Sequence, residues 1–253
     1  MAVTRRGANQ YVSSSASTSH NVPLPSGSAA GDWVIVGASN GTFGASFTMP
    51  GTELLDEGSN TMRFAISTKQ LTSTDITNNY LNIAISSSQQ CTAVIVGYSS
   101  AGGFATPGTI WKKGVEGGTF SNLAYTIAED VTSFGVDILC FSLIKHSGGA
   151  QSFSSISSPA TTLATALKTG TSMPSAHVGV YTGTPTDITS TWSVASTNGI
   201  GVQVAVLDVA PDDLFGIYTG SGFAPIDTVL SILDVPAEAL GIWNGSSIDG
   251  IEG

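Results

Sequence analysis

Apolar and polar residues alternate with a period of two through much of this chain. The alternation is clearest in the stretches NTMRFAIST, NYLNIAIS and IGVQVAVL, where for example Leu81, Ile83 and Ile85 are separated by Asn82 and Ala84. Successive side chains of a strand point to opposite faces, so this pattern predicts strands with one buried face and one polar face.

Three other stretches, DWVIVGAS, CTAVIVGYS and FGVDILCFSLI, are more continuously apolar. Strands in the middle of a sandwich have this composition. Tracts rich in Gly, Ser and Pro, such as PLPSGSAAGD and HSGGAQSFSSISSP, separate the predicted strands. At least about eight strands with almost no helical periodicity predict an all-β fold, an antiparallel β-sandwich that is jelly-roll-like or a related Greek key.

Two segments leave the choice between helix and strand open. Residues 160–170, ATTLATALKTG, can form a short helix, but their threonine content fits an extended segment equally well. Residues 227–233, DTVLSIL, have Asp227 as a candidate N-cap and Pro236 as a stop, which allows a turn or two of helix. Neither alternative changes the predicted fold class.

The texture of the chain changes after Leu207. Residues 208–253 are rich in acidic residues, contain no Lys or Arg, and carry their apolar residues in small separate packets. A segment this short cannot bury so many large side chains within itself. We therefore predict a β-sandwich body at residues 1–207 and a C-terminal docking or oligomerisation segment at residues 208–253.

A short repeat marks that segment: GIYTGSG at 216–222 is echoed by GIWNGSS at 241–247. Flanking glycines let the backbone turn tightly, which suits short edge strands that add to a neighbour's sheet. The alternative is a pair of hairpin turns that fold back on the same sandwich. Large apolar and aromatic side chains carry most interface energy. The predicted partner-binding residues are therefore Phe215, Ile217, Tyr218, Leu233, Leu240, Ile242 and Trp243.

The charge balance limits the partners. The chain has 8 basic and 18 acidic residues, a net charge of -10, and charged residues make up 10% of it, against roughly 25% in ordinary globular domains. Eight Lys and Arg residues are too few to neutralise a run of phosphates. We therefore expect neither nucleic acid nor a membrane surface as partner. An uncharged polar surface fits either a component of an assembly or a neutral secreted domain.

The N-terminal stretch MAVTRRGANQYVSSS lacks a following apolar core, and no run of about 18 apolar residues occurs, so we expect neither a signal peptide nor a membrane-spanning helix. Cys91 and Cys140 lie in apolar runs, where a free thiol behaves as a small buried hydrophobe. A disulfide between them is the alternative.

Candidate catalytic residues are few. His20, His146 and His177 are scattered through unrelated segments without the spacing of a metal site. The sequence GASNG matches G-x-S-x-G around Ser39, but a nucleophile elbow requires a helix next, and TFGASFTMPG reads as a strand. We interpret the match as turn chemistry, and a hydrolase remains a minor alternative.

The acidic residues give one further alternative, a calcium site. Adjacent pairs such as Asp56 and Glu57 point to opposite faces of an extended chain, so they predict no catalytic pair. Asp208, Asp212 and Asp213 offer oxygen ligands for calcium, without the EF-hand pattern. We predict no cofactor.

Exposed aromatic side chains would support a different function. Trp111, Trp192 or Tyr98 can form a platform for sugars if they are exposed, because an aromatic face stacks on apolar ligand surfaces. The alternative function is therefore a carbohydrate-binding module or adhesin.

The order of several short motifs resembles a known family. A Ser/Thr-rich first strand ends in VPLP (22–25), AAGDWVIVGAS (29–39) follows, then Met49-Pro50-Gly51, MRFAIST and VIVGYSSAGG (94–103), and SAHVGVYTGTPTDITSTWSVASTNGIGVQVAVLDV closes the order. This order, over roughly residues 12–207, resembles a family of tailed-phage virion proteins found among minor tail and head-fibre-like proteins. The chain departs from the family in two motifs. Where the family often has Pro-x-Gly-Trp, this chain has Met49-Pro50-Gly51-Thr52-Glu53, and where Tyr-Arg-Gly would stand, it has Gly97-Tyr98-Ser99.

The resemblance implies a β-sandwich without catalytic residues that forms a structural or adhesive part of a particle. On this basis we expect a non-enzymatic virion protein, made in the host cytoplasm, that lies on the tail or decorates the capsid. Its expected partners are other virion proteins and copies of itself, with a host-surface glycan as a further partner.

Overall fold

The computed structural model describes residues 3–59, 61–99, 110–125, 135–146, 152–170, 172–183 and 186–207, and farther on residues 216–218, 223–225, 241–243 and 248–250. The chain divides into two compact units, Met1–Asp208 and Val209–Gly253. We call them the body and the C-terminal unit and describe each by itself.

A five-stranded antiparallel sheet, the central sheet, forms the middle of the body. Its strands, in spatial order, are β1 (Thr4–Val12), β8 (Cys91–Ser99), β3 (Trp33–Asn40), β6 (Met62–Gln70) and β5 (Thr52–Ser59). The continuously apolar stretches DWVIVGAS and CTAVIVGYS form β3 and β8, and nearly every residue of these two strands is buried. Their position in the middle of the stack explains this composition, because both faces of the sheet are covered.

A small antiparallel sheet covers one face of the central sheet. It consists of β2 (Ser17–Pro23), β7 (Tyr80–Gln89) and β4 (Phe47–Thr48). In β7, Leu81, Ile83 and Ile85 are buried while Asn82 is exposed, as the alternation predicts. Val34, Val36 and Ala65 of the central sheet pack against this small sheet in one buried cluster.

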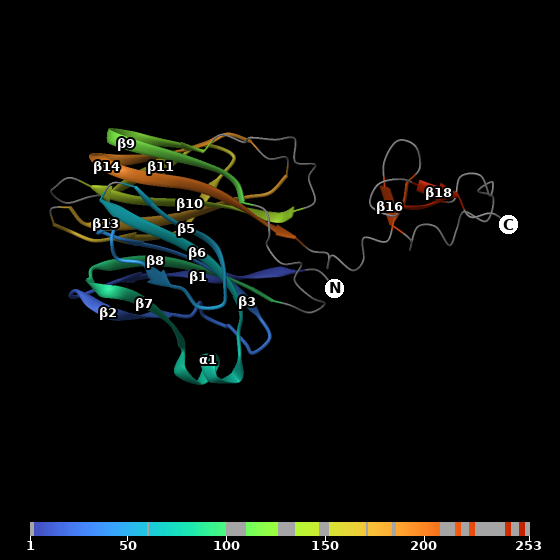
Figure 1. Ribbon diagram of the computed structural model, residues 1–253, viewed down its shortest axis with the longest axis horizontal. Helices are drawn as coiled ribbons and strands as arrows, with labels where there is room; N and C mark the ends of the chain where they lie inside the picture. The colour runs from blue at the N-terminus through green and yellow to red at the C-terminus, as the bar shows by residue number, and fades with distance from the viewer. Residues whose placement is uncertain are drawn as a thin grey trace. The chain divides into compact units, whose positions relative to one another are not determined.

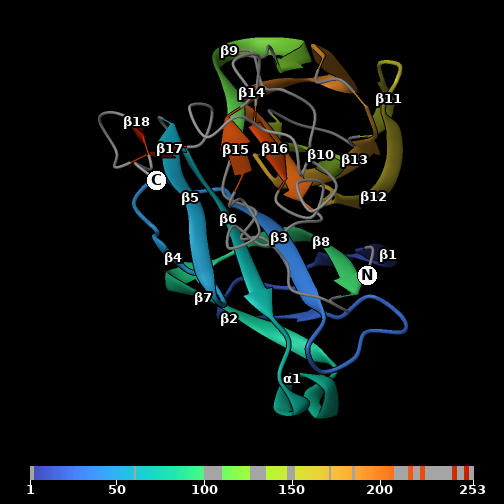
Figure 2. The same cartoon turned by 90° about the vertical axis from the view of Figure 1, so that its right-hand side faces the viewer.

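A second, six-stranded antiparallel sheet, the large sheet, covers the opposite face (Figures 1 and 2). Its strands run in the order β11 (Phe153–Ile156), β14 (Ile188–Leu207), β10 (Gly135–His146), β13 (Pro174–Tyr181) and β12 (Thr161–Leu167), and β9 (Ile110–Tyr125) also pairs with β14. Ile35, Phe64 and Ile66 of the central sheet pack against Phe141, Val178 and Val202 of the large sheet. The body is therefore a sandwich of three layers, and the prediction of an all-β antiparallel sandwich is confirmed.

Strand β14 is long enough to pair with different strands along its length. Its second half pairs with β10, while Ser190 and Thr191 near its start pair with β11. The start of the strand also returns to β10, because Ser190 and Trp192 both hydrogen-bond the Ser142 hydroxyl. This curvature buries the outer face of the large sheet around Ile138, Cys140 and Tyr181 (Figure 2).

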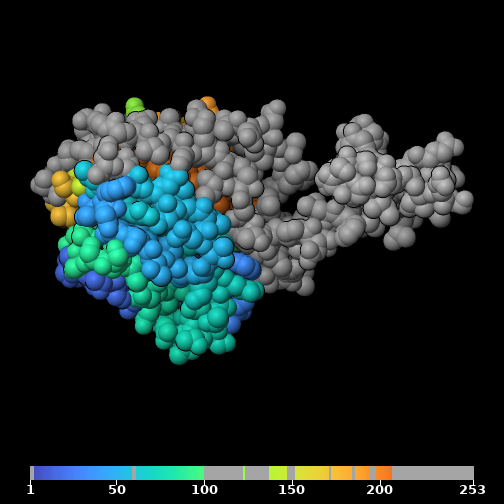
Figure 3. All heavy atoms as spheres, in the orientation of Figure 1, coloured from blue at the N-terminus to red at the C-terminus, as the bar shows by residue number. Residues whose placement is uncertain are grey.

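One helix was not predicted. Helix α1 (Ser73–Asn78) follows β6, and its N-cap Thr72 forms a reciprocal capping box with Asp75. It lies at the lower end of the body in Figure 3, where its Ser73 and Thr74 are exposed. Six residues are too few for the helical period that a sequence pattern requires.

The two ambiguous segments have different outcomes. Residues 161–167 of ATTLATALKTG form strand β12, so the extended alternative is correct. Residues 227–233 lie outside the described residues.

The C-terminal unit contains two short antiparallel hairpins. Strand β15 (Gly216–Tyr218) pairs with β16 (Phe223–Pro225), and β17 (Gly241–Trp243) pairs with β18 (Ile248–Gly250).

Candidate functional site

Three segments meet around a buried carboxylate at one edge of the interface between the central and large sheets. A bulge between Arg5 and Gly7 interrupts the pairing of β1 with β8 and sets Arg5 opposite Tyr98. The Asp137 carboxylate, near the start of β10, is 5% exposed. Its Oδ2 accepts hydrogen bonds from Arg5 Nη1 and from the Tyr98 hydroxyl, each at 2.9 Å. These bonds join β1 and β8 to β10.

The electrostatics of this cluster follow from its burial. Tyr98 is fully buried, and burial together with the neighbouring Asp137 charge raises the pKa of its hydroxyl well above the usual value. Tyr98 therefore stays protonated and donates to the carboxylate. Arg5 supplies the opposite charge through a side chain that is 35% exposed, so the pair as a whole is neutral. A charge-assisted bond of this kind holds its geometry well.

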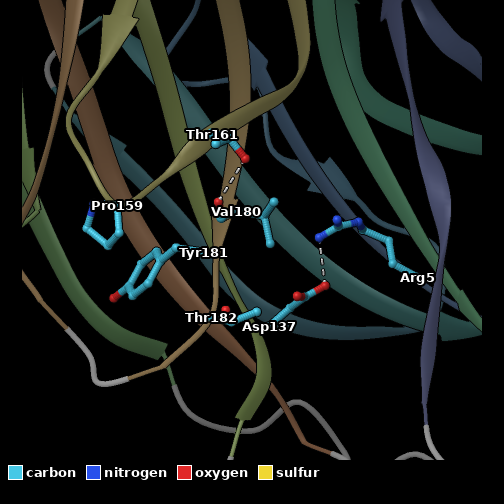
Figure 4. A pocket seen from close by; sticks show the side chains of 7 residues that line it. All are labelled: Arg5, Asp137, Pro159, Thr161, Val180, Tyr181 and Thr182. Carbon is cyan, nitrogen blue, oxygen red and sulfur yellow. Dashed lines mark hydrogen bonds and ion pairs between the residues drawn. The ribbon is translucent and has the colours of Figure 1, made fainter.

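Beside this cluster lies a cavity of about 250 Å³, which we call the Asp137 pocket. It is lined by Arg5, Asp137, Pro159, Thr161, Val180, Tyr181 and Thr182 (Figure 4). The Arg5–Asp137 pair lies on one side of the pocket, and the Pro159 and Tyr181 rings lie on the other. Val180 and Tyr181 are each 4% exposed, so the open part of the lining consists mainly of Arg5, Thr161 and Thr182.

Hydrogen bonds hold the Tyr181 side chain in place. The Tyr181 hydroxyl donates to Gln203 Oε1 at 2.6 Å and accepts from the Thr186 backbone N–H at 3.1 Å. Burial raises the pKa of Tyr181 to about 12. Tyr181 is 4% exposed and packs with Ile138 and Cys140 on the outer face of the large sheet, so little of its ring is open to the pocket. Sequence patterns did not identify this site, since its residues come from β1, β10, β12, β13 and the segments that precede β12 and follow β13.

Each histidine serves the packing of the body. His20 hydrogen-bonds the Tyr11 hydroxyl and the Ser17 carbonyl, and His146 Nε2 donates to the Lys168 carbonyl. His177 stacks on the Phe153 ring with 3.7 Å between ring centres, and burial lowers its pKa to about 3. The three histidines lie on β2, β10 and β13, and β10 and β13 are neighbours in the large sheet.

Ser39 does not have the geometry of a nucleophile elbow. It lies within β3, fully buried, and its hydroxyl shares a hydrogen bond of 2.9 Å with the Thr92 hydroxyl. The next described element is the short strand β4, so the strand-to-helix turn that an elbow requires is not formed here.

The alternative of a sugar platform required Tyr98 and Trp192 to be exposed, and both are buried. Tyr98 is completely buried beneath Asp137, and Trp192 is 2% exposed and donates to the Ser142 hydroxyl. Both side chains fill the body and present no face to a ligand. The side chain of Trp111 lies outside the described residues.

Most basic side chains are engaged inside the body. Arg6 pairs with Asp32, Arg63 with Asp56, and Lys69 with Asp75. Lys145 donates to the Gly41 and Thr61 carbonyls, and Lys168 donates to the Ser13 and Ser14 carbonyls. These bonds engage the charged groups of these basic side chains within the body.

The cysteines and the candidate metal ligands complete the set of residues considered from the sequence. Cys91 and Cys140 are free, buried thiols, and burial raises the pKa of each. Within the described ranges, no group of three or more His, Cys, Asp or Glu residues is arranged to hold a metal ion. Asp208, Asp212 and Asp213 lie outside those ranges. In the same ranges, no helix has the length and apolar character needed to cross a membrane.

Of the seven predicted partner-binding residues, Phe215, Leu233 and Leu240 lie outside the described residues, and only the backbone is described at Ile217, Tyr218, Ile242 and Trp243. These four occupy equivalent positions in the two hairpins. Ile217 and Ile242 are the middle residues of β15 and β17, and Tyr218 and Trp243 end the same strands. The repeat in the sequence is thus a repeat of backbone structure.

The repeat extends beyond the stretches GIYTGSG and GIWNGSS. Gly216 and Gly241 stand 25 positions apart, and at the same separation Pro211 matches Pro236 and Ile226 matches Ile251. The large apolar residues Phe215 and Leu240 match as well. Alignment of the two hairpins at Gly216 and Gly241 reveals these additional matches at a separation of 25 positions.

Comparison of the chain with protein-family models, with curated proteins and with solved structures finds no match.

Proposed function

We propose that the protein is a non-enzymatic structural component of a tailed-phage particle, a minor tail or capsid-decorating protein, and that it assembles through residues 208–253. Its partners are other virion proteins and further copies of itself, with a host-surface glycan as an additional partner. The order of motifs in the body supports the particle assignment, and the C-terminal unit supports the mode of assembly.

The observation that carries the assembly proposal is the identity of the two hairpins. Gly216 pairs with Pro225 and Gly241 with Gly250, so each hairpin encloses the same number of residues with the same register. Among the described residues, each has three residue pairs. An isolated two-stranded hairpin is marginally stable at best in water, so both gain stability by adding to another sheet.

The apolar residues at equivalent ladder positions support the same conclusion. Tyr218 is opposite Phe223, and Trp243 is opposite Ile248. Each hairpin thus places an aromatic residue and a second large apolar residue at the same register position. Large apolar and aromatic residues are the types that dominate protein interfaces.

Light scattering on the full chain tests the assembly step. The wild-type chain is expected to have the mass of an oligomer, and the double variant Ile217→Asp, Ile242→Asp the mass of a monomer. The matched control, Thr219→Asp with Asn244→Asp, adds the same charge between the paired strands and should keep the oligomeric mass. A monomeric wild-type chain, or a double variant with unchanged mass, would contradict self-assembly through the hairpins.

Particle association is tested separately. We expect mass spectrometry of gradient-purified phage particles to detect peptides of this chain in the particle fraction. If the chain stays in the soluble fraction of the lysate at all stages of infection, the virion assignment is wrong.

A further inference from the structure

Strand β11 covers part of the outer face of β13, and we call it the β11 lid. The Phe153 ring stacks on His177 with 3.7 Å between ring centres and 13° between ring planes. Two positions farther along β13, a Cβ atom at Gly179 would lie 2.7 Å from Cδ1 of Ile156. Alternate residues of a strand point to one face, so both apolar side chains of β11 lie on the same face of β13.

The lid encloses an imidazole whose surroundings disfavour a charge. His177 is fully buried, and its Nε2 lies 3.2 Å from the Thr162 hydroxyl. Its Nδ1 has no hydrogen-bond partner among the described residues. The rings of Phe153 and Trp192 meet it face-on and edge-on, respectively. A proton on Nδ1 would therefore be buried without an acceptor, which is costly.

The described strands around His177 supply no anion on its face. Neither β11, β12 nor the first five residues of β14 contain Asp, Glu, Lys, Arg or His. The other titratable residues of β10 and β13 are Asp137, Cys140, Lys145, His146 and Tyr181. Asp137 is the one carboxylate in that group, and it bonds Tyr98 of the central sheet, on the opposite side of β10. While the lid is closed, a charged His177 therefore has no described counter-ion.

The lid is held less firmly than the strands beneath it. β11 is an edge strand, and its ladder with β14 comprises three residue pairs with a register shift. Its two middle residues, Ser154 and Ser155, are exposed. Short edge segments open at a free energy well below that of global unfolding. Opening of β11 removes the Phe153 ring from His177 and uncovers part of Trp192, which that ring meets edge-on at 5.1 Å.

We propose that β11 is an acid-released lid: protonation of His177 favours the conformation in which β11 has left β13, and this conformation exposes Phe153, Ile156 and an edge of Trp192. The imidazole takes up its proton when the lid is open, because water then solvates the charge. Acid thus uncovers an apolar patch on the outer face of the large sheet. The lid belongs to the body, so this device is independent of the proposed assembly through the hairpins.

Hydrogen–deuterium exchange of the full chain, followed by mass spectrometry and corrected for the intrinsic pH dependence of exchange, tests the proposal. At pH 7.5 we expect the peptide that contains β11 to be protected about a hundredfold less than the peptide that contains β3, because the lid opens locally. Between pH 7.5 and pH 5 the protection of β11 should fall about thirtyfold, the ratio for one proton on an exposed histidine.

Two variants locate the proton. His177→Gln should keep the protection of β11 nearly constant between the two pH values. His20→Gln is the matched control, since His20 lies on β2 in the small sheet, and it should retain the fall seen in the wild-type chain.

Three results would overturn the proposal: equal protection of β11 and β3 at pH 7.5, no fall in the protection of β11 at pH 5, or an undiminished fall in His177→Gln. If His177→Gln proves unfolded by circular dichroism, a pH series on the wild-type chain decides the question. The protection of β11 must then decrease about tenfold per pH unit below about pH 6, and a flat profile contradicts the proposal.

Discussion

His177 is a titratable side chain placed where a charge is strongly disfavoured. It is fully buried, it stacks on Phe153, and its Nδ1 has no hydrogen-bond partner among the described residues. Burial lowers its pKa from 6.5 to about 3. Between these two values the unfolded chain binds a proton that the folded chain does not bind, so acidification favours unfolding.

The stability of the body should therefore fall as the pH drops below about 6.5. From His177 alone we expect the free energy of unfolding to be lower by about 2 kcal/mol at pH 5 than at neutral pH. Above pH 7 no part of this stability is lost. Urea unfolding at pH 7.5 and pH 5 measures it. The His177→Gln variant should show a clearly smaller difference between the two pH values, and an unchanged difference would contradict the assignment.

At this scale the sequence identified residue types but not their surroundings. The spacing of the histidines did not reveal that two of them, His146 and His177, lie on the neighbouring strands β10 and β13. Tyr98 and Trp192 were expected to be exposed if they served a ligand, yet both are buried. The Arg5–Asp137 pair could not be anticipated, because it joins residues from distant strands and depends on the bulge in β1.

Strand β3 shows how close the layers approach one another. Gly37 lies in the middle of this central strand, between Ile66 and Val94 of its neighbours. A Cβ atom at Gly37 would lie 2.5 Å from Cδ1 of Phe141 in the large sheet. Phe141 is fully buried in the cluster between the two sheets, so its ring has little room to move.

We therefore expect Gly37→Ala to destabilise the body by about 1–3 kcal/mol, the usual range for overpacking a well-filled core. Gly44→Ala is the matched control, since a Cβ there meets nothing within 4 Å. Thermal and urea denaturation of both variants provide the comparison. Equal stability of the two variants would show that the sheets separate easily at this point.

Strands were the most predictable elements. The alternation in NYLNIAIS gave a half-buried strand, and the continuous runs gave strands covered on both faces. Two features escaped: α1 is shorter than the period by which helices are recognised, and β14 contributes to two parts of one sheet. A hydrophobic pattern gives the environment of a strand but not its partners.

For the whole molecule, the described residues of the body bury one another. The four buried clusters of described residues run from Val3 to Val206. Each of the three layers thus packs its apolar side chains against another layer of the body. The three-layer arrangement itself was not predicted, because pairing between distant strands determines how many sheets form.

A chain that ends at Leu207 should consequently fold by itself. We expect its urea unfolding to be a single cooperative transition, with a free energy of unfolding within about 1 kcal/mol of that of the body in the full chain. Tryptophan fluorescence follows this transition through the buried Trp192. A broad transition, or a truncated chain that does not refold, would show that the body depends on the C-terminal unit.

The 25-residue separation of Gly216 and Gly241 has a consequence for affinity. If each hairpin docks on its own, one chain presents two ligands of the same kind to an array of equivalent sites. Once the first hairpin is bound, the second searches only the volume allowed by the intervening residues, at an effective concentration that reaches the millimolar range for short flexible linkers. Two weak contacts then act as one slowly dissociating attachment, and loss of either hairpin weakens retention far more than the area of one contact suggests.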